Sequence, residues 1–301
     1  PDAIRLLRQA FDLGINCFDT ADTYAKGYGE EILREALGSR RHDCIVNTKF
    51  GYDWYSNPNR EGHTERPQRW DAEFIRYACE QSLRRLGTEY IDLYQLHNPR
   101  LTTILDDDVF DTLGKLVQEG KIRYFGTALG PDIGWKAEGV ESMSGRGVSA
   151  MQIIYSIVEQ QPARDFFPIA EQNQTGLLSR VPHASDVLTD KFESLGKLQF
   201  DKDDHRAHRR QEWLDTAFQK REKIKFIVLE SGRTLAQAAI QFCLSEPSIA
   251  SVLPNIVTED DLLEFSKGSE APVLDEQEVR ELHRIYDEEF VTLESIQPQR
   301  S

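Results

Sequence analysis

The sequence predicts a parallel α/β fold, a (β/α)8 TIM barrel, and two features of its pattern support that prediction. Short apolar runs alternate with segments of helical apolar spacing along the whole chain, with no linker between them. This alternation is typical of repeated βαβ units around a parallel sheet. The alternative, an open doubly wound sheet, usually carries a glycine-rich fingerprint after its first strand. Neither G-x-G-x-x-G nor G-x-x-x-x-G-K-[ST] occurs here, which favours the barrel.

Seven strands are expected from the apolar runs. They cover residues 15–19, 44–49, 90–96, 122–127, 150–155, 176–179 and 249–253. The chain opens instead on residues 2–13, whose apolar spacing indicates a helix. Because a barrel of this kind has eight strands, we expect the first strand to be missing from this chain. The expected organisation is one barrel domain over residues 1–301, truncated at its N-terminus.

Helices are expected between the strands, where apolar residues recur at steps of three and four. They cover residues 2–13, 30–37, 71–86, 109–119, 135–144, 168–173, 235–245 and 259–265, with a further helix ending at residue 230. A last helix, residues 275–287, is expected at the surface. Gly38 and Gly87 follow two of these segments and suit the left-handed turn that ends many helices.

Composition and charge exclude several classes of partner. The net charge of −15 and the pI near 5.0 argue against nucleic acid or an anionic membrane, since both require a cationic surface. No apolar run approaches the roughly 20 residues that span a bilayer. Cys17, Cys44, Cys79 and Cys243 lie far apart and form no C-x-x-C pair. We expect reduced, buried thiols in a cytoplasmic protein, and no metal site.

Four titratable side chains lie at the ends of three successive expected strands. Asp19 ends the first strand, with Tyr24 just beyond it, Lys49 ends the second, and His97 follows the third. In a parallel barrel the C-terminal strand ends form the rim where the chemistry takes place, so these side chains are expected to meet. Taken singly, each also fits a structural role, as an ion pair, a cap or a packed ring.

Together, these groups suit proton transfer to a substrate. A tyrosine ordinarily titrates at about pH 10, so it needs help to exchange a proton near neutral pH. The apolar strand before Lys49 buries its stem, and a buried ammonium requires a partner, so an ion pair with Asp19 is expected. A cation beside a tyrosine favours the phenolate, which suits Tyr24 to acid–base work. His97 could hydrogen-bond a substrate oxygen.

The motifs around these residues resemble those of the aldo-keto reductase family, in its bacterial and potassium-channel-β-like branch. They read F-D-T-A-D-T-Y, N-T-K-F-G, L-G-T-E-Y-I-D-L-Y-Q-L-H and G-K-I-R-Y-F-G. The resemblance extends from Gly14 to Leu263. It implies a TIM barrel that binds NADPH, or less often NADH, and reduces aldehydes or ketones. It also implies a strand before the helix that opens this chain.

The resemblance implies a role for each rim residue. Tyr24 would be the general acid that protonates the carbonyl oxygen of the substrate. Lys49 and Asp19 would tune Tyr24, and His97 would orient the substrate carbonyl. All four residue types match the family motif at their positions in this chain.

Cofactor contacts are implied at two further strand ends. Gln152 matches a glutamine that contacts the nicotinamide amide, and Tyr155 matches an aromatic position near the nicotinamide, although a core tyrosine is the alternative. Where the family reads G-V-S-N, this chain reads G-T-A-L over residues 126–129. The serine and asparagine side chains that hold the carboxamide are therefore missing, and backbone groups or Thr127 would substitute in part.

The remaining cofactor contacts are implied in two loops near the C-terminus. The candidate contacts are Arg180, Pro182, His183 and Ser185 on the pyrophosphate and Pro254, Asn255, Asp261 and Glu264 near the adenosine. Asp261 stands where the family usually has a basic residue on the 2′-phosphate, which favours NADH. A basic run over residues 205–210 is either a phosphate clamp, which favours NADPH, or a solvated helix start. The cofactor prediction is therefore NADP(H) or NAD(H).

Substrate contacts are expected in the segment after His97 and in residues 51–70, a stretch that is long for a loop without structure. Trp54, Tyr55 and Trp70 are the candidate contacts, suited to a flat or apolar carbonyl compound or a sugar ring. Alternatively, these rings pack the loop onto the barrel. The predicted function is NAD(P)H-dependent reduction of an aldehyde or ketone. The alternatives are an NAD-dependent sugar or alcohol dehydrogenase, or a cofactor-binding regulatory subunit with little turnover.

Overall fold

The computed structural model describes residues 2–56, 58, 65–130, 135–191 and 211–290. The chain divides into two compact units. The first contains Pro1–Ile153 and Asp165–Leu178, and the second contains Ile154–Arg164 and Ser179–Ser301. The two units are described separately below.

The described residues form seven strands in one sheet, and the strands follow one another in sequence order. They are β1 (Cys17–Asp19), β2 (Ile45–Phe50), β3 (Ile91–His97), β4 (Ile122–Ala128), β5 (Ala150–Ile154), β6 (Gly176–Arg180) and β7 (Ile249–Leu253). The four pairings from β1 to β5 are parallel. Sequential parallel order with a helix between neighbouring strands is the strand order of a (β/α)8 barrel. The predicted fold class is confirmed.

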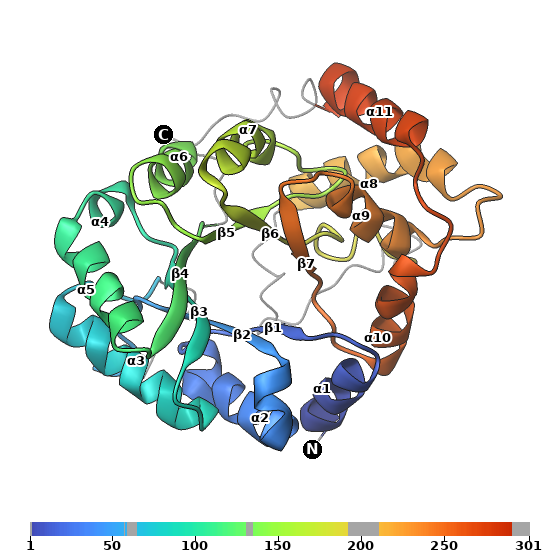
Figure 1. The fold of residues 1–301 in the computed structure, drawn as a ribbon. Coiled ribbons are helices and arrows are strands. Elements are labelled where there is room, and N and C mark those ends of the chain that lie inside the picture. Colours follow the sequence, from blue (N-terminus) through green and yellow to red (C-terminus); the bar gives the residue numbers. More distant parts are fainter. Residues whose placement is uncertain (1, 57, 59–64, 131–134, 192–210, 291–301) are drawn as a thin grey trace. The chain divides into compact units, whose positions relative to one another are not determined.

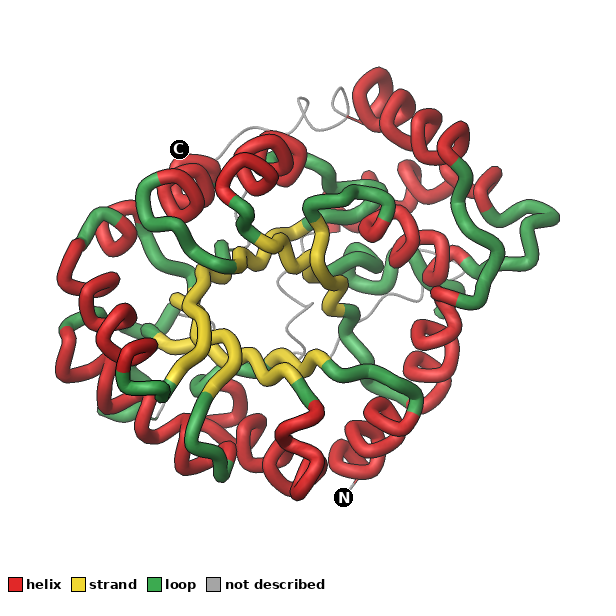
Figure 2. Tube along the Cα trace, in the orientation of Figure 1, coloured by secondary structure: helices red, strands yellow, loops and turns green. Residues whose placement is uncertain are grey.

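Helices cover the outer side of the strands in the first unit, as Figures 1 and 2 show for α2, α3 and α5 beside β1–β4. The helices of this unit are α1 (Asp2–Asp12), α2 (Tyr28–Leu37), α3 (Ala72–Leu86), α4 (Leu101–Ile104), α5 (Asp107–Gln118) and α6 (Lys136–Ser144). α3 begins where the Asp71 side chain accepts from the Phe74 amide, and it ends at Gly87, whose φ is 62°. The short helix α4 was not expected from the sequence.

The core of the first unit is formed by strands that are buried along most of their length. Every residue of β3 is buried, as expected for a parallel strand covered on both faces. Phe50 of β2 stacks on Tyr94 of β3 with ring centroids 4.3 Å apart. The polar residues Asn47, Thr48 and Lys49 are nevertheless buried near the end of β2. Polar side chains in such a place require partners, and these partners form the candidate site.

In the second unit, helices α8 (Gln211–Ile224), α9 (Leu235–Leu244), α10 (Glu259–Ser266) and α11 (Glu276–Ile285) follow β6 and alternate with β7. Helix α7 (Ala163–Asn173), most of which belongs to the first unit, begins earlier than expected and contains Pro168. Capping boxes start α9, α10 and α11. α11 corresponds to the expected helix at residues 275–287. No helix among the described residues is long and apolar enough to cross a membrane.

Candidate active site

Lys49 and Asp19 form a buried ion pair at the ends of β1 and β2. The Lys49 Nζ atom lies 2.5 Å from Asp19 Oδ2 and donates to the Thr20 carbonyl at 2.7 Å. Only 2% of the Lys49 surface is exposed. The strand register places Asp19 beside Asn47, and the Asp22 amide donates to the Lys49 carbonyl at 3.0 Å. Parallel pairing of two strand ends therefore produces the contact expected from the sequence.

The second carboxylate oxygen of Asp19 is held by glutamine side chains. Gln152 Nε2 on β5 donates to Asp19 Oδ1, and Gln95 Nε2 on β3 lies 3.5 Å from the same oxygen. Asp19 is thus fixed by groups from three other strands. Gln152 was expected on the nicotinamide amide, and in this structure one of its amide hydrogens is directed at Asp19. A contact between Gln152 and the cofactor stays a prediction, and it would use the other amide hydrogen or the side-chain carbonyl oxygen of Gln152.

Tyr24 begins the 3₁₀ turn η1 (Tyr24–Gly27), which follows β1 after residues 20–23. The Lys49 Nζ atom is 5.2 Å from the centroid of its ring. The His97 ring meets the Tyr24 ring edge to face, with centroids 5.9 Å apart. The Tyr24 side chain is 46% exposed, so a ligand can reach it. The four predicted rim residues therefore lie together in the first unit.

His97 also contacts a tyrosine that the sequence analysis did not single out. The ring of Tyr52 meets the His97 ring at 5.0 Å, and the Tyr52 hydroxyl accepts from Asn98 Nδ2 at 2.9 Å and donates to Glu65 at 2.8 Å. Burial raises the pKa of Tyr52 to about 12. Gln68 Nε2 donates to the carbonyls of His97 and Asn98. These contacts hold His97 in place. Tyr52 and Gln68 lie between β2 and α3, where no regular residue spacing indicates their role in the sequence.

The three candidate substrate aromatics are packed against the protein. Trp54 stacks on Tyr55 with centroids 4.3 Å apart, and both rings lie beside the Arg85 guanidinium. Trp70 lies over Gly51, where an added Cβ would come within 2.2 Å of its ring. Gly51 has a φ of 129°. These contacts support the alternative that the rings pack the loop, and a substrate role stays a prediction.

At the end of β4, the chain presents one hydroxyl and two apolar side chains. In the strand register, Ala128 lies beside His97 and Gln152, while Ala128 and Leu129 are buried. The Thr127 Oγ1 atom is buried and has no hydrogen-bond partner among the described residues. A buried hydroxyl without a partner is unfavourable unless a ligand supplies one. Thr127 is therefore suited to replace, in part, the serine and asparagine side chains that hold the carboxamide in the family.

In the second unit, two of the candidate cofactor residues lie in the core. The Tyr155 ring stacks on Phe242 with centroids 5.3 Å apart, and burial raises the pKa of Tyr155. The His183 ring packs against the Phe265 ring in a tilted arrangement, with centroids 4.1 Å apart, and its Nε2 lies 3.1 Å from the Ala236 carbonyl. Burial lowers the pKa of His183 to about 4. Both rings have structural partners, and their predicted cofactor contacts stay predictions.

The loop after β6 has an unusual backbone. Arg180 ends β6, Pro182 is buried and Ser185 is partly exposed. Ala184, Ser185 and Asp186 have φ values of 48°, 56° and 70°, a left-handed conformation that non-glycine residues adopt at a cost. Outliers of this kind are concentrated at ligand-binding segments, which agrees with the predicted pyrophosphate role of this loop.

Asp261 lies at the start of α10 and is already paired. Its carboxylate accepts from the Thr258 amide at 3.0 Å and lies 2.5 Å from Lys191 Nζ. Burial acts to raise the pKa of Asp261, but the hydrogen bonds from Lys191 and Thr258 outweigh it and lower the pKa. Asn255 is exposed, whereas Pro254 and Glu264 are partly exposed. The basic run at 205–210 lies outside the described residues.

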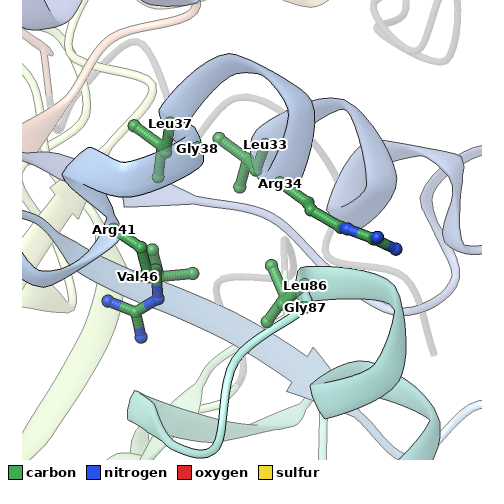
Figure 3. A pocket seen from close by; sticks show the side chains of 8 residues that line it. All are labelled: Leu33, Arg34, Leu37, Gly38, Arg41, Val46, Leu86 and Gly87. Carbon is green, nitrogen blue, oxygen red and sulfur yellow. The ribbon is translucent and has the colours of Figure 1, made fainter.

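A separate pocket of about 190 Å³ lies beside the N-terminal end of β2, away from Lys49. Figure 3 shows side chains from α2, from the start of β2 and from the end of α3 around it. Its lining residues are Leu33, Arg34, Leu37, Gly38, Arg41, Val46, Leu86 and Gly87. Val46 is near the N-terminal end of β2 and Lys49 is near its C-terminal end. This pocket is therefore distinct from the candidate active site.

Sequence comparison assigns the chain to a family. The sequence model of the Aldo/keto reductase family matches residues 1–287. The chain belongs to this family. Its members are oxidoreductases that use nicotinamide cofactors to reduce carbonyl groups. The resemblance inferred from the sequence motifs is thereby confirmed.

Individual relatives agree with this assignment. The "Uncharacterized oxidoreductase YqkF" of Bacillus subtilis (strain 168) is 30% identical over 283 residues, which cover 93% of this chain and 86% of YqkF. A "Probable voltage-gated potassium channel subunit beta" of Oryza sativa subsp. japonica is 29% identical, over 89% of this chain and 81% of the subunit. The holo form of aldo-keto reductase AKR11C1 from Bacillus halodurans superposes with a TM-score of 0.76 at 27% identity, covering 94% of this chain and 86% of AKR11C1.

Proposed function

We propose that this aldo/keto reductase reduces the carbonyl group of a small aldehyde or ketone, with Tyr24 as the general acid. The observation that supports this proposal most strongly is the buried Lys49–Asp19 ion pair beside the Tyr24 ring. Removing an ammonium from water is costly. The burial of the Lys49 ammonium beside the Tyr24 ring is best explained by a need for positive charge next to the Tyr24 hydroxyl. We further infer a cytoplasmic location, supported by the four free cysteines.

The proton chemistry follows from the positions of the side chains. A bound nicotinamide cofactor supplies the hydride that reaches the carbonyl carbon. The carbonyl oxygen gains a proton from the Tyr24 hydroxyl, and the phenolate that remains is stabilised by the Lys49 ammonium. Asp19 keeps Lys49 charged and in place, and His97 orients the carbonyl oxygen. Because Tyr24 is partly exposed, it can recover its proton from solvent.

The residues present fit a nicotinamide cofactor. The buried Thr127 hydroxyl without a partner suits the carboxamide, and the remaining amide groups of Gln152 can assist it. In the second unit, the left-handed loop at Ser185 is the proposed pyrophosphate contact. Asp261 would repel a 2′-phosphate if it were unpaired, but Lys191 balances its charge. The proposal therefore includes both NADPH and NADH.

The alternative is a cofactor-binding regulatory subunit with little turnover. It is favoured by the likeness to a probable potassium channel subunit beta and by the two apolar residues, Ala128 and Leu129, at the end of β4. The buried ion pair beside Tyr24 favours the enzyme, because cofactor binding alone does not require that charge.

A spectrophotometric assay separates these functions. The purified chain is incubated with NADPH or NADH and a panel of aldehydes and ketones, and with NADP⁺ or NAD⁺ and a panel of sugars and alcohols. We expect absorbance at the nicotinamide band to fall with at least one carbonyl compound. Turnover restricted to the oxidative panel would indicate a dehydrogenase. Tight cofactor binding without turnover on either panel would contradict the enzyme and support the regulatory subunit.

A further inference from the structure

A buried polar network lies beneath the candidate active site, between η1, α2 and α3. Its centre is Glu30, whose side chain is fully buried. Glu30 Oε2 accepts from Arg85 Nε at 2.6 Å, and Glu30 Oε1 accepts from Thr48 Oγ1 at 2.6 Å. Thr48 directly precedes Lys49 on β2. Glu30 therefore connects a guanidinium on α3 to the strand that carries the proposed catalytic lysine.

Arg85 also packs against the turn that carries Tyr24. Gly27 closes this turn with a φ of 86°, and a Cβ at Gly27 would lie 2.5 Å from Arg85 Cδ. No other residue type fits there without moving the arginine. The aliphatic part of Arg85 is thus in direct contact with the turn, while its guanidinium is fixed by Glu30.

The network returns to the active site through a second path. Arg85 Nη2 donates to the Tyr55 hydroxyl at 2.9 Å, and this hydroxyl donates to Asp22 Oδ2 at 3.3 Å. Asp22 lies two residues before Tyr24, and its amide binds the Lys49 carbonyl. Burial, reinforced by the nearby charge of Glu30, raises the pKa of Asp22. Glu30 is therefore the carboxylate that pairs with Arg85, and Asp22 completes the network through Tyr55.

We propose that Arg85 is a positioning residue for the reaction proposed above. It contacts neither substrate nor the reacting atoms. Instead, it holds the Tyr24 turn through Gly27 and the Lys49 strand through Glu30 and Thr48, so that the Tyr24 hydroxyl and the Lys49 ammonium keep their relative position. Because the Tyr24 turn and the Lys49 strand are both held by the Arg85 side chain, loss of Arg85 displaces the Tyr24 hydroxyl from the Lys49 ammonium. This inference rests on the proposed function.

The variant Arg85→Met tests the inference, with Arg84→Met as a matched control that removes the same charge from an exposed position on the same helix. The readouts are kcat and KM with one carbonyl substrate, the Kd for the cofactor from its fluorescence, and circular dichroism of the fold. We expect kcat to fall about tenfold to a hundredfold in Arg85→Met, as small misplacements of reacting groups can do, with the cofactor Kd within about twofold of wild type. Arg85→Lys, which retains the charge, should recover part of kcat.

The outcomes are distinguishable. Unchanged kcat in folded Arg85→Met, or a fall matched by Arg84→Met, overturns the positioning role while leaving the proposed function intact. If Arg85→Met does not fold, Arg85→Lys and Tyr55→Phe decide the question, since each keeps the packing but weakens a bond of the network. Wild-type kcat in both would overturn the inference. Absence of turnover in the wild type overturns the proposed function and this inference together.

Discussion

At the scale of single residues, the site depends on a charge that is buried but balanced. The partners of Lys49 Nζ include the Asp19 carboxylate, the Thr20 carbonyl and the Tyr24 ring. Breaking a buried pair by removing one partner typically costs about 3–5 kcal/mol. Lys49 and Asp19 are therefore coupled in stability as well as in the proposed chemistry, and variants of either must be checked for folding.

His183 provides a residue-scale prediction about pH. Burial lowers its pKa from 6.5 to about 4, so the unfolded chain binds a proton at this residue between these pH values and the folded chain does not. The resulting stability is present above pH 6.5 and is lost as the pH falls towards 4. We expect this residue to contribute a loss of about 3 kcal/mol in the free energy of unfolding. Denaturant unfolding of wild type and His183→Gln across this range measures it.

The His183→Gln variant retains a side-chain donor for the Ala236 carbonyl but does not titrate. Its free energy of unfolding should therefore depend less on pH than that of the wild type over the same interval. Parallel pH dependence in the two proteins would show that His183 is protonated or exposed in the folded state.

The residue types of the site could be predicted from the sequence, but their supports could not. Asp19, Lys49 and His97 end strands, so parallel pairing brings them together with Tyr24. Arg85 and Glu30 are 55 residues apart, and neither ends a strand, so no spacing connects them. Tyr155 and His183 were predicted as cofactor contacts from the family resemblance, yet both rings pack against core residues, because a motif does not specify the direction of a side chain.

At the scale of elements, the helix and strand alternation was predictable because it depends on local apolar spacing. The boundaries that differ have local causes. Helix α7 begins at Ala163 and tolerates Pro168 inside it, and α4 is a single turn that no periodicity could indicate. The left-handed conformation of residues 184–186 was also unpredictable, since none of them is glycine.

The loop after β6 gives an element-scale prediction. Ala184 and Ala238 are both fully buried, but Ala184 has a positive φ and Ala238 lies inside α9. Ala238→Gly should lower the free energy of unfolding by about 1 kcal/mol or more, through helix propensity and the lost methyl group. In Ala184→Gly, removing the methyl group also lowers the free energy of unfolding, but relief of the left-handed strain offsets this fall by about 1 kcal/mol. Ala184→Gly should therefore be less destabilising than Ala238→Gly. Thermal or denaturant unfolding compares the two, and equal losses would contradict the strain.

At the scale of the whole molecule, the (β/α)8 fold class and the family were both predictable. The four motif segments lie in the first unit, where the ends of β1, β2 and β3 provide the proposed catalytic groups. The chain divides into two compact units, and the single barrel domain over residues 1–301 stays a prediction. Gln152 and Thr127 belong to the first unit, whereas the remaining predicted cofactor contacts belong to the second.

The central claim is that Tyr24 donates the proton, and Tyr24→Phe tests it most directly. This change removes one hydroxyl and leaves the ring beside Lys49 and His97. Tyr28→Phe is the matched control, because Tyr28 is exposed on α2 and has no proposed role. With a carbonyl substrate that the wild type reduces, Tyr24→Phe should lose about 10²–10⁴-fold in kcat with the cofactor Kd within about twofold of wild type. A kcat close to that of the wild type and of Tyr28→Phe would contradict the account.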